Sequence, residues 1–290
     1  MTEQRKKLTV PELRERKQAG EKVVMASIPD YPMAVWAERA GLDIVAVGDS
    51  LGMISYGYPN TLPVTVDQMI EHTRAVRRGA PNTMCLVAMP YGSYSTPEVG
   101  VTNALRIMKE ADADVVKMQG GRDKFETIKA IADSGVPVMS HVGMCPHFVH
   151  QYGGFKYQGR TADDAMKIID DALAIQEAGA VGFEIEAVPA PVGKAVDDVV
   201  GIFTFGIGAG PTACGQLLLA ADLLGSFDQF KPKFTKRYAQ LAQVAVDALE
   251  TYAREVRAGE FPDEDHCYGM NAEEEAKLKD LIAGQAESWA

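Results

Sequence analysis

The sequence predicts an α/β protein in which eight parallel strands close into a (β/α)8 TIM barrel. Two observations favour this fold. Short β-rich segments alternate with helical segments along the whole chain, as expected for parallel strands joined by helices. The length of 290 residues also suits one barrel domain over residues 1–290, because no linker or composition break divides the chain. A doubly wound open sheet has the same alternation and is the alternative.

The strand and helix candidates follow one another in order. The predicted strands are residues 23–27, 43–47, 84–89, 114–118, 137–142, 180–185, 202–206 and 216–220. The predicted helices between them include residues 31–40, 66–78, 98–111, 125–133 and 162–178. Three helices run into Gly41, Gly135 and Gly179, and glycine there predicts a left-handed helix end before the next strand. Residues 271–290 predict a charged amphipathic tail helix, which lies on the surface or packs on a neighbouring subunit.

Composition narrows the class of protein. A net charge of −11 argues against a surface for nucleic acid or anionic membrane, since phosphate binding needs clustered Lys and Arg. No apolar run reaches the roughly 18 residues of a membrane span, and no apolar stretch follows the basic N-terminus as in a signal peptide. The four cysteines form no Cys-x-x-Cys pair. We therefore expect a cytoplasmic enzyme with reduced thiols and no structural zinc.

The segment Gly48-Asp49-Ser50 ends a buried strand and is the most informative feature of the chain. It places a carboxylate and free backbone N–H groups at the carboxyl end of that strand, where α/β folds bind ligands and metals. In a barrel, the other strand ends converge on the same mouth. They supply Asp30, Ala88, Lys117, Gln119, His141, Glu186 and residues 206–210.

Two cationic side chains lie within predicted strands. Lys117 stands in a Val-rich segment, where a buried ammonium is costly unless it meets a partner or a ligand. His141 is placed similarly. For Lys117 the alternatives are a site role and a structural ion pair, and for His141 a site role and a core histidine bonded to the backbone.

Carboxylates alternate along the sixth predicted strand. Glu184 and Glu186 share one face of the strand, opposite Phe183 and Ile185. A carboxylate inside a barrel needs partners, and a pKa raised by burial suits a general base. Glu186, nearest the end of the strand, is therefore the predicted base.

Three other reactive side chains follow the fifth strand. His147 and His150 are three residues apart, but no matching acid lies nearby in the sequence, so we expect them in a loop or at the surface. Cys145 could be a nucleophile, but nothing in its local sequence indicates a lowered pKa. The glycine-rich residues 206–210 are too common a pattern to predict a phosphate site.

Ordered motifs over residues 8–268 resemble the ketopantoate hydroxymethyltransferase family, whose members are (β/α)8 enzymes of the phosphoenolpyruvate mutase/isocitrate lyase superfamily. The motifs are DYP (30–32), VGDSLGM (47–53), TLPVT (61–65), HTRAVRRGAP (72–81), PYGSY (90–94), GGFKYQGR (153–160), GIGAG (206–210) and PKF (232–234).

The resemblance implies an activity and a set of roles. The family binds Mg²⁺ with its α-keto acid, a glutamate removes the proton beside the ketone, and the enolate attacks the one-carbon unit of 5,10-methylenetetrahydrofolate. The corresponding residues are Asp49 for the metal, Ser50, Lys117 and His141 for the substrate, and Glu186 as the base. The resemblance also implies a homo-oligomer and a place in pantothenate biosynthesis.

Two substitutions change the implied metal site. A second metal aspartate is replaced by Ala88, and a glutamate after the fourth-strand lysine by Gln119. Mg²⁺ is held by carboxylates, waters and substrate oxygens. We therefore expect weakened or absent Mg²⁺ binding through Asp49 with help from the amide oxygen of Gln119. Alternatively, Lys117 and His141 alone stabilise the enolate.

Three functions remain open from the sequence. The first is a hydroxymethyltransferase acting on a branched α-keto acid. The second is a diverged carbon–carbon lyase or aldolase on a related 2-oxo acid, without folate. The third is a binding or assembly subunit with weakened catalysis.

Overall fold

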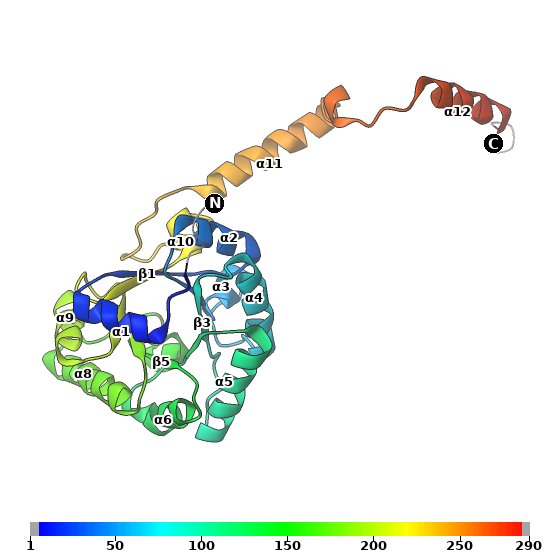
Figure 1. Ribbon diagram of the computed structural model, residues 1–290. Coiled ribbons are helices and arrows are strands. Elements are labelled where there is room, and N and C mark those ends of the chain that lie inside the picture. Colours follow the sequence, from blue (N-terminus) through cyan, green and yellow to red (C-terminus); the bar gives the residue numbers. More distant parts are fainter. Residues whose placement is uncertain (1–5, 286–290) are drawn as a thin grey trace. The chain divides into compact units, whose positions relative to one another are not determined.

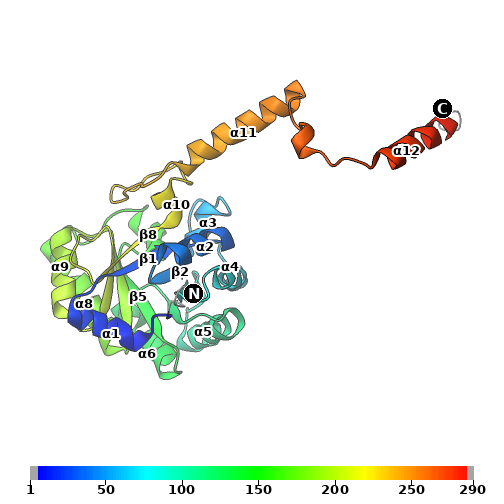
Figure 2. The ribbon, with the colours of Figure 1, turned by 45° about the horizontal axis from the view of Figure 1, so that its top comes forward.

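The eight strands form a closed parallel barrel in the computed structural model, which describes residues 6–285. The strands are β1 (Val23–Ser27), β2 (Ile44–Val47), β3 (Met84–Ala88), β4 (Val115–Lys117), β5 (Val138–Gly143), β6 (Gly182–Glu186), β7 (Phe203–Ile207) and β8 (Gly215–Leu219). Their order is β1 to β8, and β8 pairs with β1. Figure 2 shows β8, β1 and β2 side by side where the barrel closes. The predicted barrel is confirmed, and the open-sheet alternative is wrong.

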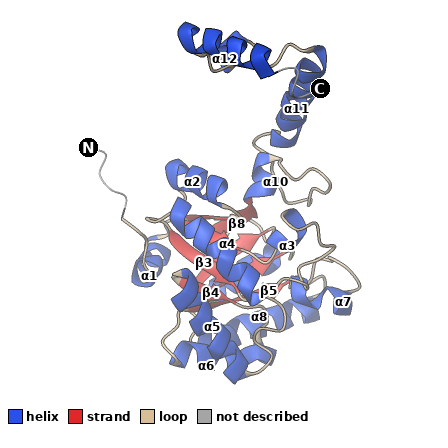
Figure 3. Cartoon of the chain, turned by 90° about the vertical axis from the view of Figure 1, so that its right-hand side faces the viewer, coloured by secondary structure: helices blue, strands red, loops and turns tan. Residues whose placement is uncertain are grey.

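Helices surround the strands (Figures 1 and 3). The helices of this unit are α1 (Val10–Ala19), α2 (Tyr31–Ala40), α3 (Leu51–Ile54), α4 (Val66–Gly79), α5 (Pro97–Ala111), α6 (Phe125–Asp133), α7 (Val149–Tyr152), α8 (Ala162–Glu177), α9 (Ala190–Val199) and α10 (Ala220–Leu224), with 3₁₀ turns η1 (Arg122–Lys124) and η2 (Pro146–Phe148). Each of the five predicted helices is present. Gly41, Gly135 and Gly179 all have positive φ, as predicted for the helix ends.

Side chains of the strands alternate between two apolar layers. Val45 and Val47 of β2 pack toward the helices, whereas Ile44 and Ala46 belong to the cluster inside the barrel. The same alternation holds on β4, where Val115 lies inside the barrel. Polar side chains two residues further along β4, β5 and β6 therefore point inward, toward the carboxyl ends of the strands.

A second compact unit follows the barrel. The chain divides into Met1–Ala239 and Gln240–Ala290, and the second unit contains α11 (Leu241–Ala258), the 3₁₀ turn η3 (Glu264–His266) and α12 (Ala272–Gln285). The tail helix predicted for residues 271–290 is confirmed as α12, and its last residues, 286–290, lie outside the described residues. The assignment of residues 1–290 to one domain stays a prediction. No helix within residues 6–285 is long and apolar enough to cross a membrane.

Candidate active site

A cavity of about 370 Å³ opens at the carboxyl ends of the strands. It is lined by every residue to which the sequence assigned a site role, which are Asp49, Ser50, Lys117, Gln119, His141 and Glu186. Two further strand-end residues have other surroundings. Ala88 is buried in the core, and Asp30 caps α2 by accepting a hydrogen bond from the backbone N–H of Met33 at 2.9 Å. The roles of the six lining residues stay predictions.

Four charged side chains from β4, β5 and β6 form one group, here called the ionic cluster: Lys117, His141, Glu184 and Glu186. Lys117 Nζ lies 3.1 Å from Glu184 Oε2. The two ring nitrogens of His141 lie 3.2 Å from Glu184 Oε2 and 3.3 Å from Glu186 Oε2. Three of these side chains are almost fully buried, while that of Glu186 is 14% exposed toward the cavity. Glu186 is thus the carboxylate of the cluster best placed to meet a ligand.

Mutual attraction keeps the buried members of the ionic cluster charged. Burial alone would lower the pKa of Lys117, but Glu184 and Asp49 outweigh it and the pKa is raised. The pKa of His141 is likewise raised, because its contacts with Glu184 and Glu186 outweigh burial. Burial would raise the pKa of Glu184, yet Lys117 and His141 lower it. Lys117 thus forms the ion pair of one predicted alternative, and because it also lines the cavity, the site role of the other stays a prediction.

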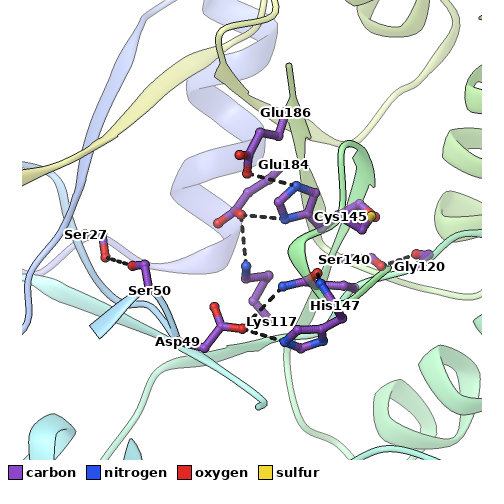
Figure 4. A network of polar contacts seen from close by, with 12 residues as sticks. Ser27, Asp49, Ser50, Lys117, Gly120, Ser140, Cys145, His147, Glu184 and Glu186 are labelled. Atoms are coloured by element: carbon purple, nitrogen blue, oxygen red, sulfur yellow. Dashed lines mark hydrogen bonds and ion pairs between the residues drawn. The ribbon is translucent and has the colours of Figure 1, made fainter. Parts of the chain in front are cut away.

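The second group, here called the Asp49 cluster, consists of Asp49, Tyr94, Gln119 and His147. His147 Nε2 lies 2.5 Å from Asp49 Oδ2, and Gln119 Nε2 donates to the same oxygen at 3.4 Å (Figure 4). Gln119 Oε1 accepts from the backbone N–H of His147 at 2.9 Å. Tyr94 Oη lies 2.5 Å from His147 Nδ1 and accepts from the backbone N–H of Gln119 at 3.3 Å. These contacts link Asp49 to His147, His147 to Tyr94, Tyr94 to Gln119 and Gln119 back to Asp49, so the cluster is a closed hydrogen-bonded ring. All four residues are buried.

Charge and burial act differently on the two acids of the Asp49 cluster. Burial would raise the pKa of Asp49, but His147 and Lys117 outweigh it and lower the pKa to about 2. Asp49 is therefore an ionised acceptor, and His147 Nε2 donates to it. Burial and the nearby Asp49 raise the pKa of Tyr94, so its hydroxyl keeps its proton. That proton is free to bond His147 Nδ1, because Tyr94 Oη itself accepts from the backbone N–H of Gln119.

His147 lies in a turn, as expected of a loop residue, but it is buried and not at the surface, whereas His150 is exposed as expected. The acid that His147 meets is Asp49, which is 98 residues away in sequence. Pro146 begins the turn η2 shortly after β5, and this turn brings the imidazole of His147 against Asp49. One signal in the sequence could have indicated this contact: His147 is only four residues beyond the end of β5, close to the edge where the strand ends meet.

Backbone geometry next to Glu186 is tightly constrained. Ala187 has a φ of 45°, a left-handed conformation that is uncommon for a residue other than glycine. Gly143 also has positive φ, and a Cβ there would lie 2.3 Å from the carbonyl oxygen of Glu186. The residue at the end of β5 must therefore be glycine for β6 to place Glu186 at the mouth.

Two hydroxyls and one thiol complete the surroundings. Ser50 Oγ lies 3.4 Å from Ser27 Oγ, on the side of the cavity formed by β1 and the residues that follow β2 (Figure 4). Cys145 is buried, and burial raises the pKa of its thiol, which donates to the carbonyl oxygen of His141 at 3.2 Å. Such a thiol is a poor nucleophile.

The Asp49 cluster does not fit a hard divalent cation. One Asp49 oxygen already accepts from an imidazole and an amide, and the amide oxygen of Gln119 already accepts from a backbone N–H. Ala88 offers no ligand, and Glu184 is held by Lys117. In the described part of the chain, no group of three or more His, Cys, Asp or Glu side chains is placed to hold a metal ion.

Comparisons with known proteins agree on the family and the fold. The family model for ketopantoate hydroxymethyltransferase matches residues 7–264. A 3-methyl-2-oxobutanoate hydroxymethyltransferase 1 of Methylibium petroleiphilum is 51% identical over 96% of this chain and 95% of its own length. A 3-methyl-2-oxobutanoate hydroxymethyltransferase of Alkaliphilus metalliredigens is 48% identical over 91% of this chain and 93% of its own.

Solved structures with the same fold are more distant in sequence. Phosphonopyruvate hydrolase in complex with oxalate and Mg²⁺ has a TM-score of 0.60 at 14% identity, over 96% of this chain and 98% of its own. The 2,3-dimethylmalate lyase, a PEP mutase/isocitrate lyase superfamily member, has a TM-score of 0.60 at 13% identity, over 97% and 96%. A barrel of this fold thus holds a divalent metal in the hydrolase complex.

Proposed function

Since this chain belongs to the ketopantoate hydroxymethyltransferase family, we propose that it is an enzyme that converts the α-keto acid 3-methyl-2-oxobutanoate into its hydroxymethyl derivative. The resemblance found in the sequence motifs is thereby confirmed at the level of the family. The observation that carries the proposal is the ionic cluster at the cavity of a barrel with this family's sequence. We place the reaction in pantothenate biosynthesis, as the family name implies.

The keto acid offers one carboxylate and one ketone oxygen, and both need positive partners. The ammonium of Lys117 faces the cavity and has three donors, of which Glu184 takes one. When the C3 proton leaves, the electron pair of the C–H bond moves toward the ketone, and negative charge grows on its oxygen. A buried ammonium stabilises that charge more than the neutral ketone, which lowers the barrier to enolate formation.

Glu186 is the proposed base. It lines the cavity, is the most exposed acid of the ionic cluster, and lies 3.3 Å from His141. The contact with His141 orients the carboxylate and leaves its second oxygen available to take the C3 proton. Ser50 also lines the cavity, and its hydroxyl can donate a hydrogen bond to the carboxylate of the keto acid.

A further feature supports a larger co-substrate, 5,10-methylenetetrahydrofolate. The cavity of about 370 Å³ exceeds what a five-carbon keto acid fills, and its outer part is lined by aromatic rings. Phe155, Tyr157, Phe230 and Phe234 are all more than a third exposed there. Aromatic faces suit a planar ring system, and the neighbouring Lys156 and Lys233 suit its carboxylates.

The chemistry balances with that donor. Water adds to the one-carbon unit and both of its bonds to folate nitrogens break, which gives formaldehyde and tetrahydrofolate with one proton on each nitrogen. The enolate carbon then bonds to the formaldehyde carbon, and the resulting alkoxide takes up the C3 proton held by Glu186. No step is assigned to a metal, because the donor groups around Asp49 are already engaged. The homo-oligomeric state and the cytoplasmic location implied by the family and composition stay proposals.

Product analysis tests the function. The protein is incubated with 3-methyl-2-oxobutanoate and 5,10-methylenetetrahydrofolate, and products are followed by mass spectrometry. A product heavier by one CH₂O unit, formed only with the folate, is expected. Cleavage of related 2-oxo acids without folate would favour the lyase reading. Binding of the keto acid with no product from any of these mixtures would favour a binding subunit.

A further inference from the structure

We infer that His147 occupies the place of a divalent cation on Asp49, and that this chain forms its enolate without a divalent metal. The inference rests on the proposed function for the identity of the keto acid. It concerns the Asp49 cluster, which has no role in the chemistry above. The step it describes transfers the C3 proton of the keto acid to Glu186 and leaves the electron pair as an enolate beside Lys117.

The first observation is that Asp49 Oδ2 already accepts from two donors. Asp49 Oδ2 accepts from His147 Nε2 at 2.5 Å and from Gln119 Nε2 at 3.4 Å. A cation bound at that oxygen would have to displace both donors. Because all three side chains are buried, each displaced N–H would lose a hydrogen bond that water cannot replace.

The second observation is that the donors are themselves locked. The backbone N–H of His147 holds Gln119 Oε1, so the side-chain oxygen of Gln119 is turned away from Asp49. Tyr94 holds His147 Nδ1, and the backbone N–H of Gln119 bonds Tyr94. Freeing one ligand for a metal would therefore break several bonds of a closed ring at once.

The third observation is the charge around Asp49. The remaining carboxylates of the mouth, Glu184 and Glu186, are paired with Lys117 and His141. Lys117 and His141 both act on Asp49 as positive charges. A dication entering here would find Glu184 and Glu186 already paired and would have to compete with His147 and Gln119 for the carboxylate of Asp49.

His147 is accordingly a positioning residue and not a catalytic one, since both its ring nitrogens are engaged within the cluster. It supplies to Asp49 an N–H donor at the oxygen where a metal would otherwise bind. Asp49 then keeps one wall of the cavity in place, while Lys117 remains the group that faces the developing enolate.

Binding of Mn²⁺, followed by its electron paramagnetic resonance signal, tests the inference without requiring activity. We expect the wild-type protein to bind no Mn²⁺ at millimolar concentration, with or without keto acid. His147→Ala should gain Mn²⁺ affinity by about tenfold or more, because it removes the nearer of the two donors from Asp49 Oδ2. The double variant His147→Ala with Ala88→Asp should bind Mn²⁺ more tightly still. His150→Ala, an exposed histidine on the neighbouring helix α7, is the control and should gain none.

A gain of binding cannot come from mere loss of structure, and circular dichroism checks that each variant is folded. Stoichiometric Mn²⁺ binding by the wild-type protein would overturn the inference, as would unchanged binding in a folded His147→Ala. A chain that binds no Mn²⁺ but also forms no enolate would count against the proposed function and still support the replacement of the cation by His147.

Discussion

The two clusters at the mouth of the barrel are built in different ways. The ionic cluster uses inward-facing residues of three consecutive strands, and its charges balance within the group. The Asp49 cluster joins residues that follow strands, and a single carboxylate is held by neutral donors and one imidazole. Strand alternation dictates the first arrangement, whereas only the path of the turns dictates the second. The proposed roles also differ. The residues of the ionic cluster act on the substrate, whereas the Asp49 cluster holds one wall of the cavity in place.

Replacing the proposed base, Glu186, should have the largest effect on activity and tests the role given to the ionic cluster. Glu186→Gln should lower the rate of product formation by about 10²–10⁴-fold, since the amide keeps the shape of the side chain but cannot take the C3 proton. Initial rates at saturating keto acid measure the effect. The exposed Glu177→Gln on α8 is the matched control and should leave the rate unchanged. Equal rates for Glu186→Gln and wild type would remove Glu186 from the mechanism.

Removing the buried cation tests how the ionic cluster supports the fold. Lys117→Met leaves Glu184 without its ammonium partner and should lower the free energy of unfolding by about 3–5 kcal/mol. Lys129→Met breaks the exposed pair with Asp133 and should leave the free energy of unfolding almost unchanged. Urea denaturation of both variants measures the contrast, and similar values for the two would contradict it.

The cost of Lys117→Met should depend on pH. The pKa of Glu184 is lowered below its ordinary 4.5, so its ionised form stabilises the fold above that pH and the contribution is lost as the pH falls through the folded pKa. The pKa of Lys117 is raised above its ordinary 10.5, so its contribution is present below that pH and is lost as the pH rises through the folded pKa. The difference between wild type and variant should thus be largest between these two values. A difference that grows outside that range would contradict the ionised pair.

The Asp49 cluster should contribute less to the free energy of unfolding than the ionic cluster. His147→Ala removes one donor to Asp49 Oδ2 and the acceptor of the Tyr94 hydroxyl, and should cost about 1–3 kcal/mol. His150→Ala, three residues along, should cost less than about 0.5 kcal/mol because its side chain is exposed. Thermal unfolding of the two variants compares them directly. A larger loss for His150→Ala would show that the buried ring has been misassigned.

The smallest effect concerns the thiols. Cys85, Cys145 and Cys214 are buried and Cys267 is exposed. We expect iodoacetamide to modify Cys267 quickly in the folded protein and Cys145 only after unfolding, because burial also raises the pKa of the Cys145 thiol. Peptide mass spectrometry after a short pulse measures both sites. Fast loss of activity through modification of Cys145 would restore a nucleophilic reading of that residue.

Periodic features were predictable from the sequence. The eight strands followed from β-rich runs that alternate with helical segments. The shared face of Glu184 and Glu186 followed from the strand itself, because every second side chain points to the same side. The ion-pair partner of Lys117 could not be predicted, since Glu184 lies on a strand two places further along the barrel. The contacts of His147 could not be predicted either. The turn after β5 has no periodicity, and the residue that His147 meets, Asp49, is remote in sequence.

The measurement that tests the central claim most directly is exchange of the C3 proton of 3-methyl-2-oxobutanoate in D₂O, followed by NMR without folate. The claim is that Glu186 forms the enolate at a site that needs no divalent cation. It predicts exchange that persists at an undiminished rate in excess EDTA and disappears in Glu186→Gln. Exchange that stops in EDTA and returns with Mg²⁺, or that survives in Glu186→Gln, would contradict it.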